Sequence, residues 1–308
     1  MKTSLIAVAL AALTFSASAQ TPKRPLINGV SHIALYVHDI EKSRQFYKDF
    51  LGFGEPFLLN NPNGSLSLTF IKVNDRQYIE LFPEVTPNTD RLNHISIETD
   101  NAEAMRLYLK ASGIKVPDAT PKGRIKNSNF NVKDADGHTV EIVQYEPDGL
   151  SMVNKGKFMD GPRISKRIMH LGITVGSLEP AMKFYRDVLG FKETWRGSKD
   201  GKTLSWVNMQ VPDGEDYIEF MLYDQFPTAR LGTLHHIALE VPDIEKAKAD
   251  LESRPARKNY TRPMDIATGV NRKRQMNLYD PDGTRSEVME PHTVDGKPTP
   301  PSSAPPPR

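Results

Sequence analysis

The chain has 308 residues, which is enough for two domains of ordinary size that each bury a core. Its 40 lysines and arginines nearly balance its 38 aspartates and glutamates, and no basic or acidic block occurs. This balance argues against nucleic acid or an anionic membrane as a partner. There is no cysteine, so disulfides and thiolate chemistry are excluded.

The first residues, MKTSLIAVALAALTFSASAQ, have the parts of a secretory signal. Lys2 precedes an apolar run from Leu5 to Phe15, and Ala17-Ser18-Ala19 is the small-x-small pattern that signal peptidases cut. The apolar run is too short to span a bilayer. We therefore expect residues 1–19 to be removed and the protein to be exported, either periplasmic or secreted. No membrane contact is expected after this cleavage.

Four later segments repeat one pattern. Each begins with an apolar, strand-like run that has a histidine near its start, namely SHIALYV from Ser31, NHISIET from Asn93, MHLGITV from Met169 and HHIALEV from His235. A segment of helical period follows each run, and three of the four have a glycine near the helix end. Shorter strand-like runs come next, and the last one in each copy carries a glutamate: YIELF, TVEIVQY, YIEFM and SEVME. The histidine precedes this glutamate by 47 to 51 residues in every copy.

The repeated unit predicts an α+β fold of four modules, each with a strand, a helix and about three further strands. The modules group in pairs, over residues 25–148 and 166–291, and residues 149–165 show no period and are expected to form the linker. Residues 292–308 are rich in proline and poor in apolar residues. We expect them to form a disordered, solvated tail.

Strand alternation places the histidines and glutamates on one surface. In the first strand Ile33, Leu35 and Val37 share the face that suits packing on the helix, whereas His32 faces the other side. The other three copies follow the same rule, with only the second histidine of the pair at positions 235 and 236 in register. The glutamates alternate in the same way, and the residue two positions after each in-register histidine is small: Ala34, Ser96, Gly172 or Ala238.

A metal site explains this pattern economically. A buried carboxylate is costly unless it is paired or bound to a cation. Imidazole and carboxylate ligands suit Zn, Ni, Mn or Fe(II), whereas Ca is disfavoured by imidazole. The alternative is that each histidine is a satisfied core residue and that each glutamate pairs with a lysine or arginine. Two further features also stay open. Trp195 and Trp206 fit either a pocket wall or the core, and the basic run from Arg272 to Arg274 fits either an anionic substrate or a solvated strand edge.

The sequence resembles the vicinal oxygen chelate superfamily, which includes glyoxalase I, the extradiol dioxygenases and the bleomycin resistance proteins. The segments HIALYVHDIEKSRQFYKDFLGF and HLGITVGSLEPAMKFYRDVLGF carry this resemblance. It implies four βαβββ modules paired into two half-barrel domains. It also implies two sets of metal ligands, which are His32, Glu80, His94 and Glu141 in the N-terminal half, and His170, Glu219, His236 and Glu287 in the C-terminal half. Whether modules pair within a half or across halves stays open.

The resemblance implies an enzyme that acts on a small molecule. We expect a divalent-metal-dependent lyase or isomerase that chelates two substrate oxygens and passes through an enediolate, with Glu80, Glu141, Glu219 or Glu287 as the base. One alternative is an Fe(II) extradiol dioxygenase, for which His170, His236 and Glu287 match the ligands. Against it, the dioxygenase signature has a further histidine shortly before the last glutamate ligand, and this chain has no histidine between His236 and Glu287. The other alternative is a non-catalytic binding protein. The chain is expected to be a monomer or a homodimer.

Overall fold

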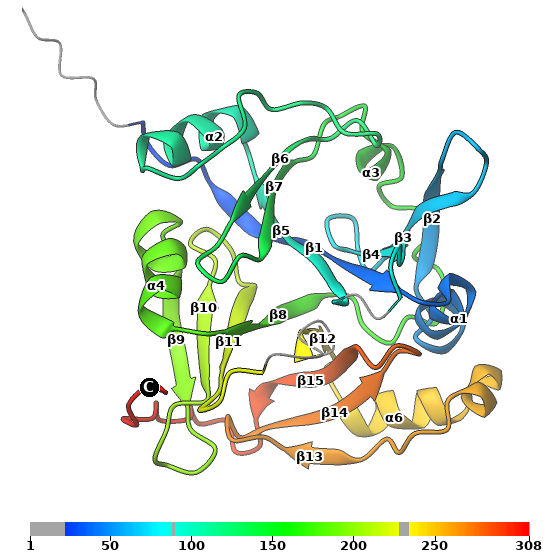
Figure 1. The fold of residues 1–308 in the computed structure, drawn as a ribbon. Coiled ribbons are helices and arrows are strands. Elements are labelled where there is room, and N and C mark those ends of the chain that lie inside the picture. The colour runs from blue at the N-terminus through cyan, green and yellow to red at the C-terminus, as the bar shows by residue number, and fades with distance from the viewer. Residues whose placement is uncertain (1–21, 88–89, 228–233, 308) are drawn as a thin grey trace, which may run out of the picture.

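The computed structural model describes residues 22–87, 90–227 and 234–307. Two curled β-sheets, one from each half of the chain, make up the two domains (Figure 1). This confirms the predicted α+β fold of paired half-barrels. The predicted signal segment lies outside the described residues. Within the described part of the chain, no helix is both long enough and apolar enough to cross a membrane.

The N-terminal sheet has the strand order β2-β3-β4-β1-β5-β7-β6. Its two modules join where β1 and β5 pair antiparallel, while β1 pairs parallel with β4 and β5 pairs parallel with β7. Modules therefore pair within a half, which the sequence left open. The strands are β1 (Ile27–Val37), β2 (Gly54–Asn60), β3 (Leu66–Lys72), β4 (Tyr78–Pro83), β5 (Leu92–Thr99), β6 (Ser128–Lys133) and β7 (Thr139–Gln144).

The C-terminal sheet repeats this arrangement, in the order β13-β14-β15-β12-β8-β11-β10-β9. Here β8 and β12 join the two modules antiparallel, and each pairs parallel with the glutamate-bearing strand of its own module. The strands are β8 (Ile168–Val175), β9 (Lys192–Gly197), β10 (Trp206–Gln210), β11 (Tyr217–Leu222), β12 (His236–Glu240), β13 (Ile266–Thr268), β14 (Lys273–Tyr279) and β15 (Arg285–Thr293).

One helix follows the first strand of each module and covers one face of its sheet. The apolar residues that alternate along β1, such as Ile33, Leu35 and Val37, are fully buried against it. In the first and third modules the helix continues as a wider π-helical turn, which ends at Gly52 or Gly190 with φ near +80°. The helices are α1 (Ile40–Arg44) with η1 (Gln45–Phe50), α2 (Ala102–Ala111), α3 (Leu150–Val153), α4 (Leu178–Met182) with η2 (Lys183–Val188), and α6 (Ile244–Glu252) with the 3₁₀ turn η3 (Pro255–Asn259).

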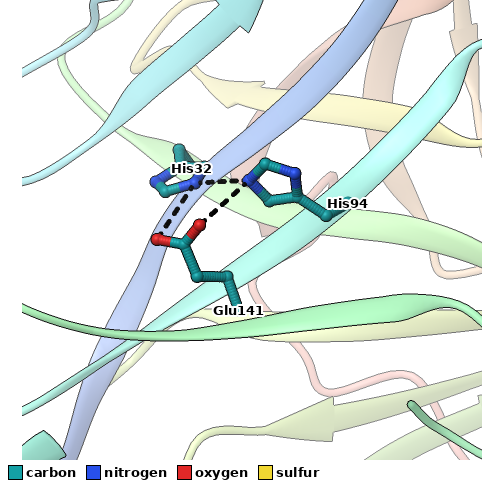
Figure 2. Close-up of side chains that lie close together, drawn as sticks. All are labelled: His32, His94 and Glu141. Atoms are coloured by element: carbon teal, nitrogen blue, oxygen red, sulfur yellow. Dashed lines mark hydrogen bonds and ion pairs between the residues drawn. The ribbon is translucent and has the colours of Figure 1, made fainter. Parts of the chain in front are cut away.

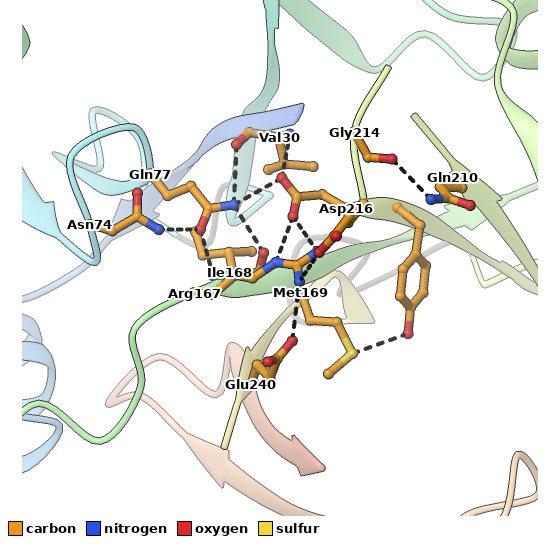
Figure 3. Close-up of polar contacts among 12 residues, drawn as sticks. Val30, Asn74, Gln77, Arg167, Ile168, Met169, Gln210, Gly214, Asp216 and Glu240 are labelled. Carbon is orange, nitrogen blue, oxygen red and sulfur yellow. Dashed lines mark hydrogen bonds and ion pairs between the residues drawn. The ribbon is translucent and has the colours of Figure 1, made fainter. Parts of the chain in front are cut away.

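The two halves meet through equivalent residues related by approximate twofold symmetry. Gln77 and Asp216, which each lie three residues before a site glutamate, face one another with Gln77 Nε2 donating to Asp216 Oδ2 at 3.1 Å (Figure 3). Gln77 Oε1 accepts from the backbone N–H of Ile168, and Asp216 Oδ2 accepts from that of Val30. Each half therefore supplies a hydrogen-bond acceptor to a backbone N–H of the other half's first strand.

A second pair of contacts crosses between the halves at the π-helical turns. Tyr47 donates its hydroxyl to Asp280 Oδ2 at 3.2 Å, and Tyr185 donates to Asp134 Oδ2 at 3.0 Å. Both aspartates begin an Asp-x-Asp-Gly turn that precedes the last strand of a module. The tyrosines of modules one and three thus bind the turns of modules four and two.

The C-terminal segment differs from the expected solvated tail. Ser302 N–H donates to the carbonyl of Arg196, and the carbonyl of Pro305 accepts from the N–H of Leu204 at 2.8 Å. Ala304 is buried. Proline has no N–H but keeps its carbonyl acceptor, so a proline-rich strand can still bind the edge of a domain.

Candidate metal centres

The N-terminal centre brings together all four predicted side chains of that half. His32 on β1 and His94 on β5 lie across the module junction, and Glu80 on β4 and Glu141 on β7 lie on the two parallel neighbours of these strands. The two Nε2 atoms are 2.9 Å apart. His32 Nε2 is 3.5 Å from Glu80 Oε1, and His94 Nε2 is 3.4 Å from Glu141 Oε2. Figure 2 shows both rings and the Glu141 carboxylate directed to one point.

The C-terminal centre repeats this constellation with His170, His236, Glu219 and Glu287. Its two Nε2 atoms are 3.0 Å apart. His236 Nε2 lies 3.4 Å from Glu219, and His170 Nε2 lies 3.5 Å from Glu287. Both histidines are fully buried, whereas His32 and His94 keep 5% and 7% of their surface exposed. His235 is out of register, as predicted, and its ring lies beside His138 instead.

The spacing of the donor atoms suits a divalent ion in both halves. Ligand nitrogens and oxygens bind zinc at about 2.0–2.2 Å, so two ligands of one ion are about 3 Å apart at a right angle and about 4.2 Å apart at most. The nitrogen–nitrogen and nitrogen–oxygen distances span 2.9–3.9 Å in the N-terminal centre and 3.0–4.0 Å in the C-terminal centre. Distance therefore does not distinguish the two centres.

Hydrogen bonds fix the tautomers in the N-terminal centre. Tyr145 donates its hydroxyl to the carbonyl of Arg76, so it accepts from Ser31 Oγ at 2.7 Å. Ser31 Oγ must then accept from His32 Nδ1–H at 3.1 Å. His94 Nδ1 donates to Asn93 Oδ1 at 3.0 Å, because an amide oxygen only accepts. Both rings therefore carry their proton on Nδ1.

As a result, two Nε2 lone pairs face each other at 2.9 Å. Two acceptors at this distance repel one another unless a cation lies between them. Outer partners that hold Nδ1–H are the usual means of fixing a metal-ligating histidine. The N-terminal centre fits a divalent metal.

Burial sets the ionisation of these groups. It lowers the pKa of His94 to about 4 and lowers the pKa of His32 well below its usual value, with a contribution from the neighbouring His94. Both rings are therefore neutral at pH 7, which is the form that binds metal. Burial also raises the pKa of Glu141 to about 7, and burial together with the Glu141 charge raises the pKa of Glu80 well above its usual value. A bound cation would favour the ionised carboxylates.

The C-terminal centre has the opposite hydrogen-bond pattern. Arg285 Nη2, which only donates, lies 2.7 Å from His236 Nδ1. Neutral His236 therefore carries its proton on Nε2 and donates it to His170 Nε2 at 3.0 Å. The two Nε2 atoms satisfy each other without a cation, and the guanidinium charge opposes one. The C-terminal centre does not fit a metal in this arrangement, although its donor atoms are correctly spaced.

A glycine makes room for this arrangement. An added Cβ at Gly172 would lie 1.8–2.5 Å from the ring atoms of His236. The equivalent position in the N-terminal half is Ala34, which has a Cβ and pairs with His94 across the same strand junction. The ring of His236 thus occupies space that is closed to His94.

A cavity lies beside each centre. The N-terminal cavity has a volume of about 170 Å³ and walls that are mostly apolar, with Arg124 among its lining residues. Near the C-terminal centre lies a cavity of about 320 Å³, whose lining includes Trp195, Trp206 and Arg285. Both tryptophans therefore line a cavity rather than fill the core, which is one of the two interpretations that the sequence left open. Arg272 and Arg274 pair with Asp295 and Glu290, as a solvated strand edge would.

Comparison with known proteins places these features in a family. The model of the glyoxalase/bleomycin resistance protein/dioxygenase superfamily matches residues 29–142 and 167–288. A lactoylglutathione lyase of Neisseria meningitidis is 30% identical over 122 residues, which are 37% of this chain and 88% of that protein. A putative ring-cleaving dioxygenase of Bacillus subtilis, MhqA, is 22% identical over 246 residues, which are 71% of this chain and 74% of that protein.

A solved structure shows the same fold. It is the Mn(II)-bound glyoxalase from Novosphingobium aromaticivorans, which superposes with a TM-score of 0.63 at 18% identity and covers 86% of this chain and 83% of its own.

Proposed function

Because this chain belongs to the glyoxalase/bleomycin resistance protein/dioxygenase superfamily, we propose that its N-terminal half is a divalent-metal-dependent lyase or isomerase for a small substrate with two neighbouring oxygen atoms. One observation carries the proposal. Two imidazoles with inward lone pairs and two buried carboxylates converge at one point beside a cavity. His32, His94, Glu80 and Glu141 would hold the ion. The bound ion would polarise a substrate carbonyl and acidify the adjacent C–H bond.

The protein itself would supply the base. Glu141 is held by Asn129 Nδ2, which donates to its Oε1 at 3.2 Å. In the described part of the chain, Glu80 has no such donor, and its polar neighbours are the two imidazoles and the Glu141 carboxylate. Glu80 is therefore the carboxylate that is freer to leave the ion and accept a proton from carbon. Burial raises the pKa of Glu80, and a more basic carboxylate accepts a proton from carbon more readily.

The cavity limits the substrate. Its volume of about 170 Å³ is below the range of about 300–1,000 Å³ that is common for ligand pockets. Leu59, Phe70 and Phe82 on its walls favour an apolar body next to the chelated oxygens. We propose a substrate smaller than a glutathione adduct, because a tripeptide would exceed this space.

The Glu80→Gln variant tests the proposed base. Glutamine keeps the shape and an oxygen ligand but accepts no proton, so turnover of the best α-ketoaldehyde or related substrate should fall at least about 100-fold. The matched control is Glu219→Gln in the C-terminal centre, which should change turnover less than about threefold. Steady-state kinetics at equal metal content measures both. Full activity of Glu80→Gln would reject the assignment.

A ring-cleaving dioxygenase is the second candidate. In the N-terminal centre His32, His94 and Glu141 place ligand atoms within 4.8 Å of one another, and two imidazoles with one carboxylate are the donor set of non-haem Fe(II) oxygenases. However, no histidine besides the ligands lines either centre's cavity among the described residues. Oxygen uptake with catechols by the Fe(II)-loaded protein would favour the dioxygenase, and turnover without oxygen uptake favours the lyase or isomerase.

We also propose that the protein is exported. Residues 1–19 have the composition of a signal peptide, so the mature chain should begin near Gln20. Intact mass spectrometry of the protein from a periplasmic or secreted fraction should give this shortened mass. Recovery of the full-length mass in the cytosolic fraction alone would contradict export.

A further inference from the structure

Arg285 lies at the centre of a donor-rich region in the C-terminal half. It lines the cavity of about 320 Å³ beside Glu219 and Glu287 and also a neighbouring cavity of about 360 Å³. Both cavities share the same three wall residues, which are Lys199, Trp206 and Arg285. The two spaces therefore meet around one guanidinium group.

The guanidinium has few partners. Its Nη2 donates to His236 Nδ1 and lies 3.7 Å from the sulfur of Met221. Its Nε is buried without a hydrogen-bond partner. Among the described residues it forms no direct ion pair, although its charge attracts the nearby Glu287 carboxylate. A buried donor without an acceptor is costly, and an oxygen atom of a ligand would remove this cost.

One further donor in this wall lacks a partner. Trp195 Nε1 is buried and unsatisfied. Trp195 lines the same cavity as Arg285, and Trp206 adds a flat apolar surface. A ligand that matches this cavity would have oxygen atoms that accept from the unsatisfied N–H donors, and a flat apolar body that packs on the tryptophan.

We propose that the C-terminal cavity is a metal-free binding site for a small aromatic carboxylate. Arg285 would bind the carboxylate through its planar guanidinium, which matches two oxygens at once. The tryptophans would pack against the aromatic ring. Lys199, an exposed residue shared by the two cavities, would add positive charge at the rim. This site is independent of the chemistry proposed for the N-terminal centre.

Benzoate binding to the metal-loaded mature chain tests the proposal. Titration calorimetry should show binding of benzoate, and Arg285→Met should weaken it at least about tenfold because the charge and both donors are lost. Arg285→Lys should give an intermediate affinity, since lysine keeps the positive charge but cannot donate to two carboxylate oxygens in one plane. The neutral analogue benzamide should bind at least about tenfold more weakly than benzoate.

Arg124→Met is the matched control, because Arg124 lines the N-terminal cavity. It should leave the affinity for benzoate unchanged. The proposal is overturned if benzoate does not bind, if benzamide binds equally well, or if the loss follows Arg124→Met rather than Arg285→Met. Retained metal content in Arg285→Met shows that the variant is folded. Failure of the proposed function would instead appear in the kinetics of Glu80→Gln.

Discussion

The double variant His32→Ala/His94→Ala should lose its metal and at least about 1,000-fold of its turnover. These two rings present lone pairs to one point, and no other described nitrogen ligand lies in that centre. Without them, the two carboxylates alone would bind a transition ion weakly. Elemental analysis and steady-state kinetics on the same preparations measure both effects.

The matched control removes the equivalent pair from the other half. His170→Ala/His236→Ala should keep about one metal ion per chain and turnover within about threefold, because those rings satisfy each other. Thermal unfolding of both variants checks that they fold. If the C-terminal pair proves essential and the N-terminal pair dispensable, the active half has been misassigned. If neither pair matters while a ligand still binds, the protein is a binding module.

The second large effect concerns stability and pH. Asp280 is buried, and this burial raises its pKa from 3.8 to about 7 against the hydrogen bonds that Asp282, Thr284 and Tyr47 donate to it. The folded state favours the protonated form of Asp280. This stabilisation is complete below the pKa that Asp280 has in the unfolded chain, and it is lost as the pH rises through the pKa in the folded protein. The free energy of unfolding should therefore fall by up to about 3 kcal/mol from about pH 5 to about pH 8.

Asp280→Asn should remove the share of this pH dependence that Asp280 contributes, and leave the share of the buried Glu80 and Glu141 carboxylates. The amide oxygen can still accept from the two backbone N–H groups, and the amide can donate to Tyr47, so the variant should be the more stable protein at about pH 8. Asp134→Asn is the contrasting variant, because Asp134 also accepts from His138 Nδ1 at 2.8 Å and would lose an ion pair. Chemical denaturation across this pH range measures both. An unchanged slope in Asp280→Asn would show that Asp280 is not the titrating group.

Periodicity in the sequence predicted the fold because each strand is apolar toward its helix at every second residue. The same alternation predicted that the in-register histidines and the glutamates share the opposite face, where the structure brings them together. The pairing of modules within each half was not predictable. All four histidine-led strands have similar patterns, so either partner would bury the same kind of surface.

The difference between the two centres was also missed, although signals for it exist. Ser31 and Asn93 immediately precede the N-terminal histidines and accept their Nδ1 protons, whereas Met169 and His235 precede the C-terminal ones. Arg285 lies two residues before Glu287 and therefore on the same strand face. Ring orientation depends on such neighbours and on the space at Gly172, which repeat spacing does not encode.

The contacts that cross between the halves have a consequence for how the two halves stay assembled. Tyr47 with Asp280, Tyr185 with Asp134 and Gln77 with Asp216 all join residues of one continuous chain. A tether of this kind gives each partner an effective concentration near the millimolar range, which dilution of the protein does not change. The fused pair of halves therefore stays assembled at any abundance, where two separate copies would drift apart.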